Sequence, residues 1–456
     1  MSMLWGLGGM VFIIAIAVLF SVDRRKINLR TVSLALLAQI LLGVLVLYVP
    51  AGRAALEALT AGVQTVIQSA NAGINFLFGP ILPEEGGVFA FQVLPVIVYF
   101  ASLTAVLYYL GILQWVVKII GGAMAKVFGT TVPESMNTAA NIFLGQSEAP
   151  LLIKRHLPHL KTSELFAVMV GGMATVAGSV MVGYSLLGAQ LEYLIAASFM
   201  AAPGALFIAK IIVPAGALES PEWQGDGSTA HTQPPTRGGL MGALRRGGNR
   251  GAVHESAHEL KHRQETQQET PADTAPAVAA DTDDEPVNVI DAAARGATEG
   301  LGLALNVGAM LLAFIALIAL INTLLGAAGG LFGLEALTLE EILGWVFAPI
   351  MFLIGVPWNE AVDAGSYLGQ KLVLNEFVAF SAFGPEVENY SAKTQAIVTF
   401  ALTGFANFAT LAIQLGGLGG LAPTQRKRIA RLGLLAVLSG TLANLMSAAI
   451  AGMLIS

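Results

Sequence analysis

Long apolar stretches separated by short polar loops dominate the chain. The first two cover 4–22 and about 31–49, within a segment 1–52, and each is long enough to cross the hydrocarbon core of a bilayer. The others cover about 91–128, 163–187, 193–215, 300–324, 394–421 and 432–455. Because these runs are continuous and do not alternate with polar positions, the pattern predicts membrane-spanning helices and not a β-barrel. We therefore expect eight transmembrane helices.

Segment 53–80 has a different pattern. Its apolar residues recur at helical spacing, with polar residues between them. This spacing predicts an amphipathic helix that lies in the plane of the membrane surface. A transmembrane helix packed inside the bundle is the alternative.

Two half-polar stretches, 132–160 and 338–385, interrupt the series of spans. The first turns around Gly145-Gln146-Ser147-Glu148-Ala149-Pro150, and the second breaks at Pro357-Trp358-Asn359-Glu360, with its second half at 369–383. Each half is too short to cross the bilayer. Irregular backbone at membrane depth is tolerated only where it is buried in protein or lines a cavity. We therefore predict two re-entrant hairpins.

The basic residues set the topology. Arg24, Arg25, Lys26 and Arg30 follow the first span, and Arg426, Lys427, Arg428 and Arg431 precede the last one. The positive-inside rule places both clusters in the cytoplasm and both termini outside, so that the two hairpins enter from opposite sides. Each hairpin precedes two spans. The repeated segments are 132–160 and 163–216 in one set and 338–385 and 394–456 in the other, while 91–128 and 297–325 are long helices outside the repeat. This order predicts an inverted repeat, as in secondary transporters.

Composition supports a polytopic membrane protein. Apolar residues make up 55% of the chain, charged residues 12%, and mean hydropathy is +0.70. These values argue against a soluble enzyme or a nucleic-acid-binding protein. The absence of cysteine excludes disulfides and thiolate metal sites. Segment 217–288 is polar and rich in Gly, Pro and Gln, so we expect a largely disordered cytoplasmic insert.

Polar side chains within the apolar segments suggest a binding site. Glu148 lies at the tip of the first hairpin and Glu376 in the second, and a carboxylate at this depth costs at least ~2.5 kcal/mol unless it has a partner or a function. Asn407 and Thr410 would share one face of a helix. We expect no Arg or Lys in mid-membrane, which disfavours an anionic substrate. A neutral, polyhydroxylated solute such as a sugar or nucleoside fits these groups.

The insert contains a competing motif. His254, Glu255 and His258 match the H-E-x-x-H pattern of zinc metalloproteases, and His262 extends it. Zinc catalysis needs a rigid, dry site, which a polar insert does not supply. We therefore interpret the chain as a transporter and not as an enzyme.

Three segments together resemble the signature sequences of the concentrative nucleoside transporters of the bacterial, eight-span type. They are Gly145–Pro150, Asn375-Glu376-Phe377-Val378-Ala379, and Gly404-Phe405-Ala406-Asn407-Phe408 followed by Gln414-Leu415-Gly416-Gly417. The resemblance implies a homotrimer in the cell (inner) membrane. In each subunit a scaffold would hold a mobile transport domain that moves like an elevator.

The resemblance also implies the roles of individual residues. Gln146, Ser147 and Glu148 would face the nucleobase, together with Phe405. Glu376, Asn407 and Thr410 would hold the ribose. The implied sodium site has the side chains of Asn141 and Thr175 and the carbonyls of Leu144 and Val176.

These expectations define a symporter that imports nucleosides such as uridine with sodium. A proton-coupled symporter with Glu148 as the proton carrier is one alternative, and a passive facilitator of polyhydroxylated solutes is the other. We expect the bilayer, nucleoside, sodium and further copies of the chain as partners, and no nucleic acid.

Overall fold

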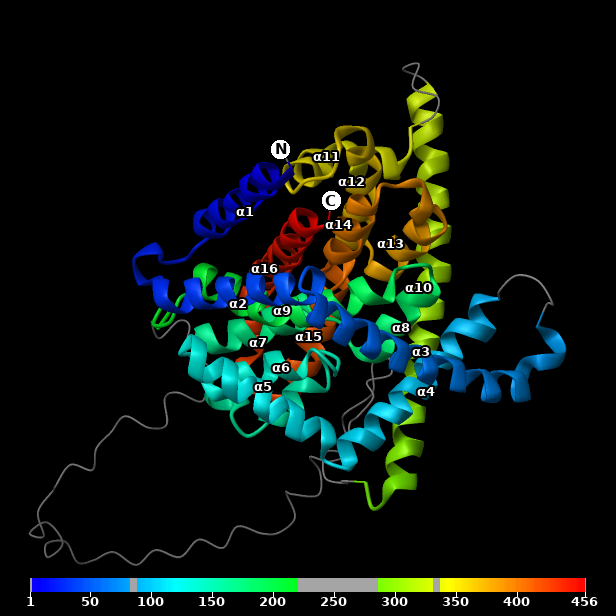
Figure 1. The fold of residues 1–456 in the computed structure, drawn as a ribbon, viewed down its shortest axis with the longest axis horizontal. Helices are drawn as coiled ribbons and strands as arrows, with labels where there is room; N and C mark the ends of the chain where they lie inside the picture. Colours follow the sequence, from blue (N-terminus) through cyan, green and yellow to red (C-terminus); the bar gives the residue numbers. More distant parts are fainter. Residues whose placement is uncertain (1, 83–87, 220–285, 331–336, 456) are drawn as a thin grey trace, which may run out of the picture. The chain divides into compact units, whose positions relative to one another are not determined.

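The computed structural model describes residues 2–82, 88–219, 286–330 and 337–455, which belong to one structural unit (Figure 1). These residues form α-helices and short 3-10 helices and no β-strand. Six helices in the described part are long and apolar enough to cross a membrane, or seven if one bent pair counts as a span, and two further apolar helices are shorter. The predicted class, an all-helical polytopic membrane protein, is confirmed, whereas the number of eight spans stays a prediction.

The first three helices are α1 (Ser2–Leu19), α2 (Leu29–Leu47) and α3 (Pro50–Phe78). Asn28 caps α2 by accepting hydrogen bonds from the backbone N–H groups of Arg30 and Thr31. α3 buries residues such as Leu56 and Ile74 on one face and exposes most others. It covers the segment predicted to be helical and amphipathic, and its location at a membrane surface stays a prediction.

The structure differs from the single long helix predicted over 91–128. It forms α4 (Phe89–Tyr109) and α5 (Ile112–Phe128), separated by Leu110 and Gly111. Gly111 has φ +76°, a left-handed conformation that glycine adopts at little cost and that ends a regular helix. α5 then packs against the next helix, α6 (Val132–Ala140).

α4 packs along α10 (Val289–Gly330), a helix of 42 residues. Gly296 and Gly300 allow the close approach: an added Cβ would lie 2.5 Å from Ala105 Cβ and 2.6 Å from Ala101 Cβ, respectively. Small residues four positions apart are a common way for membrane helices to pack closely. Ser102 Oγ also donates a hydrogen bond to the Ala293 carbonyl, 2.8 Å away.

The remaining helices occur in two sets of the same order. The first set contains α6, α7 (Thr162–Ala174), α8 (Gly178–Leu186) and α9 (Leu191–Ile212). The second contains α12 (Trp358–Val373), α13 (Glu376–Phe383), α14 (Ala392–Leu402), α15 (Phe408–Leu421) and α16 (Arg426–Leu454). In each set one helix is interrupted, by residues 175–177 between α7 and α8 and by residues 403–407 between α14 and α15.

The two predicted hairpin segments have different backbones. α6 is followed by a turn at 141–148 and by 3-10 helices at Ala149–Ile153 and Leu157–His159, so the first segment has no second α-helical arm. In the second segment α11 (Leu339–Leu353) and α12 meet at a bend of 117° near the predicted break. The predicted second half, 369–383, is not one continuous arm, because the chain breaks again at Leu374 and Asn375, directly before Glu376.

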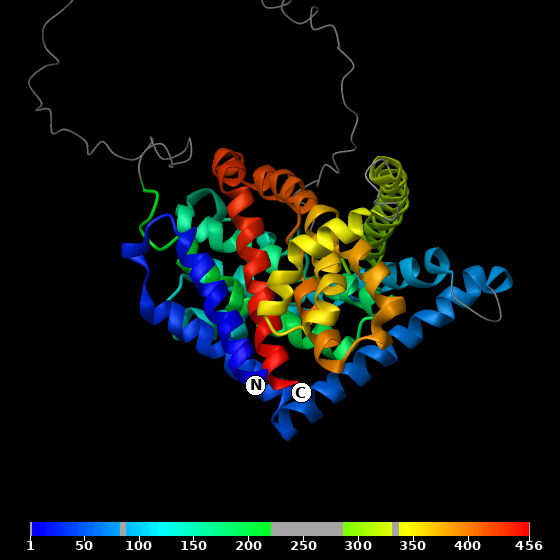
Figure 2. The ribbon, with the colours of Figure 1, turned by 90° about the horizontal axis from the view of Figure 1, so that it is seen from above.

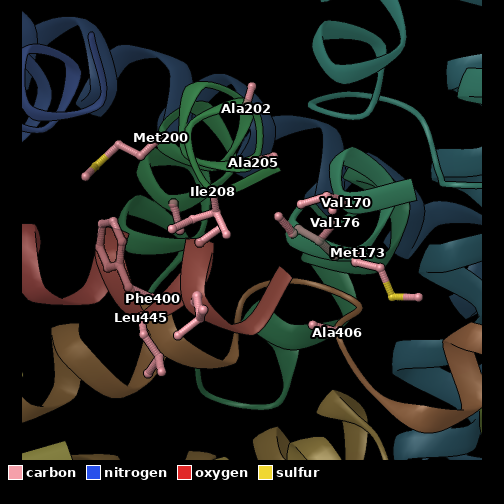
Figure 3. Close-up of a cluster of buried hydrophobic side chains, with 14 of the residues drawn as sticks. Val170, Met173, Val176, Met200, Ala202, Ala205, Ile208, Phe400, Ala406 and Leu445 are labelled. Carbon is pink, nitrogen blue, oxygen red and sulfur yellow. The ribbon is translucent and has the colours of Figure 1, made fainter. Parts of the chain in front are cut away.

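Both helix interruptions lie in the core. Figure 3 shows Val176 and Ala406, one from each interruption, among the same buried apolar side chains as Met173, Ile208 and Phe400. α16 runs beside α1 (Figure 2) and also contacts α7, α9, α14 and α15, so it packs against helices of both interruptions. The irregular backbone is therefore enclosed by protein, as its unpaired polar groups require in a membrane.

Candidate functional site

The site is centred on Glu376, which is 4% exposed and begins α13. Its Oε1 accepts a hydrogen bond from the Tyr184 hydroxyl at 3.0 Å, and its Oε2 accepts one from Asn407 Nδ2 at 2.7 Å. Asn375 caps the same helix by accepting from Val378 N at 2.9 Å. The N-terminal end of a helix favours negative charge, so the fold places this carboxylate where the helix dipole stabilises it.

Asn407 joins Glu376 to the interruption between α14 and α15. It is the N-cap of α15, and its Oδ1 accepts a hydrogen bond from Thr410 N at 2.8 Å. The expectation that Asn407 and Thr410 share a helix face is thus corrected: Asn407 precedes the helix, and the two are linked by the cap. The structure brings Glu376, Asn407 and Thr410 together, and all three are buried.

Tyr184 belongs to this site, although the sequence analysis did not single it out. Its side chain is completely buried and stacks on Phe380, with ring centroids 4.5 Å apart, while its edge meets Phe377. A buried tyrosine needs a partner for its hydroxyl, and Glu376 provides it. One feature of the sequence could have indicated it: Tyr184 is the only tyrosine in α8, a short and otherwise mostly apolar helix directly after the first interruption.

Lys371 corrects the expectation that the interior contains no basic side chain. It is 0% exposed, and its Nζ donates hydrogen bonds to the Ala401 carbonyl at 2.7 Å and to Asn444 Oδ1 at 2.9 Å. A second buried lysine, Lys210, forms an ion pair with Glu134 at 2.6 Å. The sequence pattern missed both because their partners lie in other helices.

At the first turn the predicted base-facing residues lie in a different environment. Ser147 and Glu148 are exposed, and Glu148 accepts a hydrogen bond from Gly145 N at 3.4 Å. Gln146 lies against Gly172 of α7, where an added Cβ would be 2.9 Å from Gln146 Cβ and 3.0 Å from Gln414 Nε2. In the described part of the chain neither glutamine side-chain oxygen has a hydrogen-bond partner. Gln414 therefore joins the candidate site.

The residues of the implied sodium site lie at the first interruption. Asn141 directly follows α6 and is 1% exposed, and its Nδ2 donates to the Asn137 carbonyl at 2.8 Å. Its Oδ1 is buried and finds no partner among the described residues. Thr175 Oγ1 donates to the Gly171 carbonyl at 2.7 Å, and Leu144 and Val176 are buried beside the same backbone. Neutral oxygen atoms of this kind suit a hard monovalent cation.

The two interruptions touch each other. Phe405 N donates to the Thr175 carbonyl at 3.3 Å, and Phe405 itself is half-buried. Gly404 has φ +135°, and an added Cβ there would lie 2.6 Å from the Ala174 carbonyl oxygen, so the approach of the two backbones needs glycine. Asn444 Nδ2 donates to the same Ala174 carbonyl at 2.6 Å. The two interruptions are therefore in direct backbone contact.

The histidine motif at 254–262 lies outside the described residues. Within the described ranges no group of three or more His, Asp or Glu side chains could hold a metal ion.

Buried polar groups gathered at the ends of interrupted helices, within an all-helical membrane fold, define a secondary transporter. Comparison with known proteins agrees. The family models for the N-terminus and the C-terminus of Na+ dependent nucleoside transporters match residues 8–81 and 193–452, and the model named nucleoside recognition matches residues 90–191. The chain belongs to the concentrative, Na+-dependent nucleoside transporter family, a family of transporters and not of enzymes.

Similar proteins cover the full length of the chain. An uncharacterized transporter of Bacillus subtilis, YutK, is 51% identical over 100% of both chains. The nucleoside permease NupC of Helicobacter pylori is 43% identical over 100% of this chain and 98% of its own. The solved structure of CNTnw in an inward-facing substrate-bound state is 46% identical, with a TM-score of 0.83 over 100% of this chain and 98% of that one. Family membership implies sodium as the co-transported ion.

Proposed function

We propose that this chain is a sodium-coupled symporter that imports nucleosides such as uridine. The observation that carries the proposal is the buried Glu376 carboxylate, held by Tyr184 and Asn407 at an interrupted helix. Each carboxylate oxygen can accept a further hydrogen bond, so two vicinal hydroxyl groups of a ribose would complete its shell. A solute without those hydroxyls would leave buried polar groups unpaired and bind more weakly.

The nucleobase would lie toward the first turn. The Gln146 side-chain oxygen has no partner among the described residues and would accept a hydrogen bond from a base, while Ser147 and Glu148 lie exposed next to it. Phe405 would contact the base with its half-buried ring. Thr410 and Asn407 would complete the ribose side of the site. This arrangement favours a neutral solute with a polar face and a flat face.

Sodium would bind between Asn141 and the interruption at 175–177. The support is the buried Asn141 Oδ1 without a partner, together with the carbonyls of Leu144 and Val176 and the Thr175 hydroxyl. Binding of a cation there would order the turn at 141–148, which carries Gln146 and Glu148. Sodium binding and nucleoside binding would therefore be coupled, because the turn at 141–148 belongs to both the sodium site and the nucleoside site.

Transport would proceed by alternating access, with the two hairpin segments and interrupted helices moving as one domain. The support is that both interruptions share a core and a hydrogen-bonded backbone. The scaffold would contain α3, α4 and α10, whose apolar faces would meet lipid and neighbouring copies in a homotrimer. Eight spans with both termini outside complete the proposed topology in the cell membrane.

The test is uptake of labelled uridine into proteoliposomes that contain the purified protein. An inward sodium gradient should drive accumulation above equilibrium, and replacement of sodium by choline at constant pH should abolish it. Accumulation that persists in choline and follows a proton gradient would overturn sodium coupling and favour Glu148 as a proton carrier. Equilibration without accumulation would identify a passive facilitator.

A further inference from the structure

The same structural junction occurs twice in this protein, with different chemistry. At the first junction, the turn at 141–148 packs against the interruption at 175–177: Gly178 N donates to the Phe143 carbonyl at 3.1 Å. At the second junction, the end of α12 and residues 374–376 pack against the interruption at 403–407 through the Glu376–Asn407 hydrogen bond. A threonine marks both interruptions, because Thr175 and Thr403 each donate at 2.7 Å to the carbonyl four residues earlier. The two junctions are therefore equivalent parts of the repeat.

Apart from Glu148 at its exposed end, the first junction contains only uncharged side chains, and it has unused amide oxygen atoms. Asn137 and Asn141 lie on its α6 side, and the Oδ1 atoms of both are buried without a partner in the described structure. The C-terminal end of α7 carries partial negative charge from its last carbonyls. A bound cation would provide a partner for these oxygen atoms and would balance the partial negative charge at the end of α7.

The second junction already contains a cation. Lys371, in the last turn of α12, reaches the Ala401 carbonyl in the last turn of α14, where the helix dipole is negative. Its second bond goes to Asn444, which in turn holds the Ala174 carbonyl at the end of α7. One buried ammonium group thus ties α12 to the last turns of both interrupted helices.

Lys371 is not explained as one half of an ordinary salt bridge. Lys210 reaches Glu134 at 2.6 Å, whereas none of the described carboxylates lies within 4.0 Å of Lys371 Nζ. Lys371 lies five residues before Glu376, near the end of the helix that leads to it. A buried ammonium placed on carbonyl and amide oxygens at a helix end has the ligands that a bound metal cation would have.

We propose that Lys371 is a built-in cation of the second junction: its ammonium group takes the part that a bound cation takes at the first junction, and so holds the end of α14 and Glu376 in position for the nucleoside. This inference rests on the proposed function for the identity of the ligand. It makes Lys371 a positioning residue, because it acts on the nucleoside through Glu376 and the interrupted helix. It also explains why one side of the repeat would need a transported ion and the other would not.

The experiment measures equilibrium binding of uridine to the purified full-length protein at fixed sodium concentration and ionic strength. Lys371→Met, which keeps an unbranched side chain one atom shorter and removes the charge, should weaken binding about tenfold to hundredfold, since charge-assisted hydrogen bonds are lost. Lys371→Arg should retain more affinity than Lys371→Met. In Lys371→Ala, added methylammonium or ethylammonium should restore part of the affinity, whereas tetramethylammonium, which has no N–H donor, should not.

Two results would overturn the inference. One is wild-type affinity in Lys371→Met. The other is a loss that neither arginine nor a primary ammonium ion repairs, which would show that Lys371 only fills space. Thermal unfolding of each variant, with and without the amines, gives a readout that needs no nucleoside, and stabilisation of Lys371→Ala by primary amines alone is the expected result. If the wild-type protein binds no uridine, the proposed function is refuted. The thermal-unfolding measurement with and without amines would then test the role of Lys371 by itself.

Discussion

The two junctions of this transporter solve one physical problem in two ways. Each interrupted helix ends in carbonyl groups that have no partner in the next turn and that cannot reach water in a buried site. At the first junction the buried polar side chains include amides, and the side-chain oxygen atoms of Asn137, Asn141 and Gln146 have no partner among the described residues. At the second junction Lys371 satisfies the Ala401 carbonyl and Asn444, while Asn407 bonds to Glu376 and to the backbone N–H of Thr410. The comparison teaches that two equivalent helix ends in one fold can differ in how their carbonyl groups are satisfied, and the proposed ion site and the fixed charge of Lys371 both follow from that difference.

The largest effect is expected at Glu376, because it is the charged group that would accept from the nucleoside. Glu376→Gln should reduce uridine uptake at least about hundredfold, since a charged acceptor for two hydroxyls becomes a neutral amide. Glu386→Gln, at an exposed carboxylate in the 3-10 helix after α13, is the matched control and should transport normally. If Glu376→Gln takes up uridine as well as Glu386→Gln does, the second junction is not part of the nucleoside-binding site.

Asn407 comes next, and two substitutions separate its two contacts. Asn407→Ser keeps an N-cap for α15 but loses the donor to Glu376, so uridine affinity should fall about tenfold with little change in stability. Asn407→Ala loses both contacts and should also lower the free energy of unfolding by about 1 kcal/mol. The measurements are uridine binding and thermal unfolding in detergent. Equal affinity in Asn407→Ser and wild type would show that only the cap matters.

The first junction is tested with Asn141→Ala. Because the variant removes the buried, unused oxygen, the sodium concentration for half-maximal uptake should rise about tenfold, while uptake at saturating sodium changes little. Asn389→Ala, at an exposed asparagine, is the control. An unchanged sodium response would place the ion elsewhere and would leave the first junction without a ligand.

The smallest effect is expected for Tyr184→Phe, which removes one hydrogen bond to Glu376 and keeps the stacking on Phe380. Loss of a single bond of this kind should weaken uridine binding about fivefold. Tyr193→Phe, at a ring near Phe400 and outside the junctions, should have no effect. A loss as large as that of Glu376→Gln would mean that the tyrosine hydroxyl itself contacts the nucleoside.

The local pattern was a good guide where the membrane imposes a simple rule. Continuous apolar runs predicted the long helices, and the motif around Glu376 and Asn407 predicted two groups that prove to be in contact. The pattern was wrong for 91–128, where one glycine turns the chain, and it did not indicate the second break in the other hairpin segment, which falls just before Glu376. The cause is the same in both places: an apolar run is equally compatible with a continuous and with a broken helix.

The sequence by itself determined the class of the protein, the order of its segments and the candidate residues, because hydropathy and short motifs are local properties. Only the tertiary structure decided which buried groups satisfy one another. Tyr184 meets Glu376 across 192 positions of the chain, and Lys371 meets Asn444 across 73. A buried polar group needs a partner, but neither periodicity nor composition says which distant helix supplies it. The difference between the two junctions is therefore a property of the packed helices.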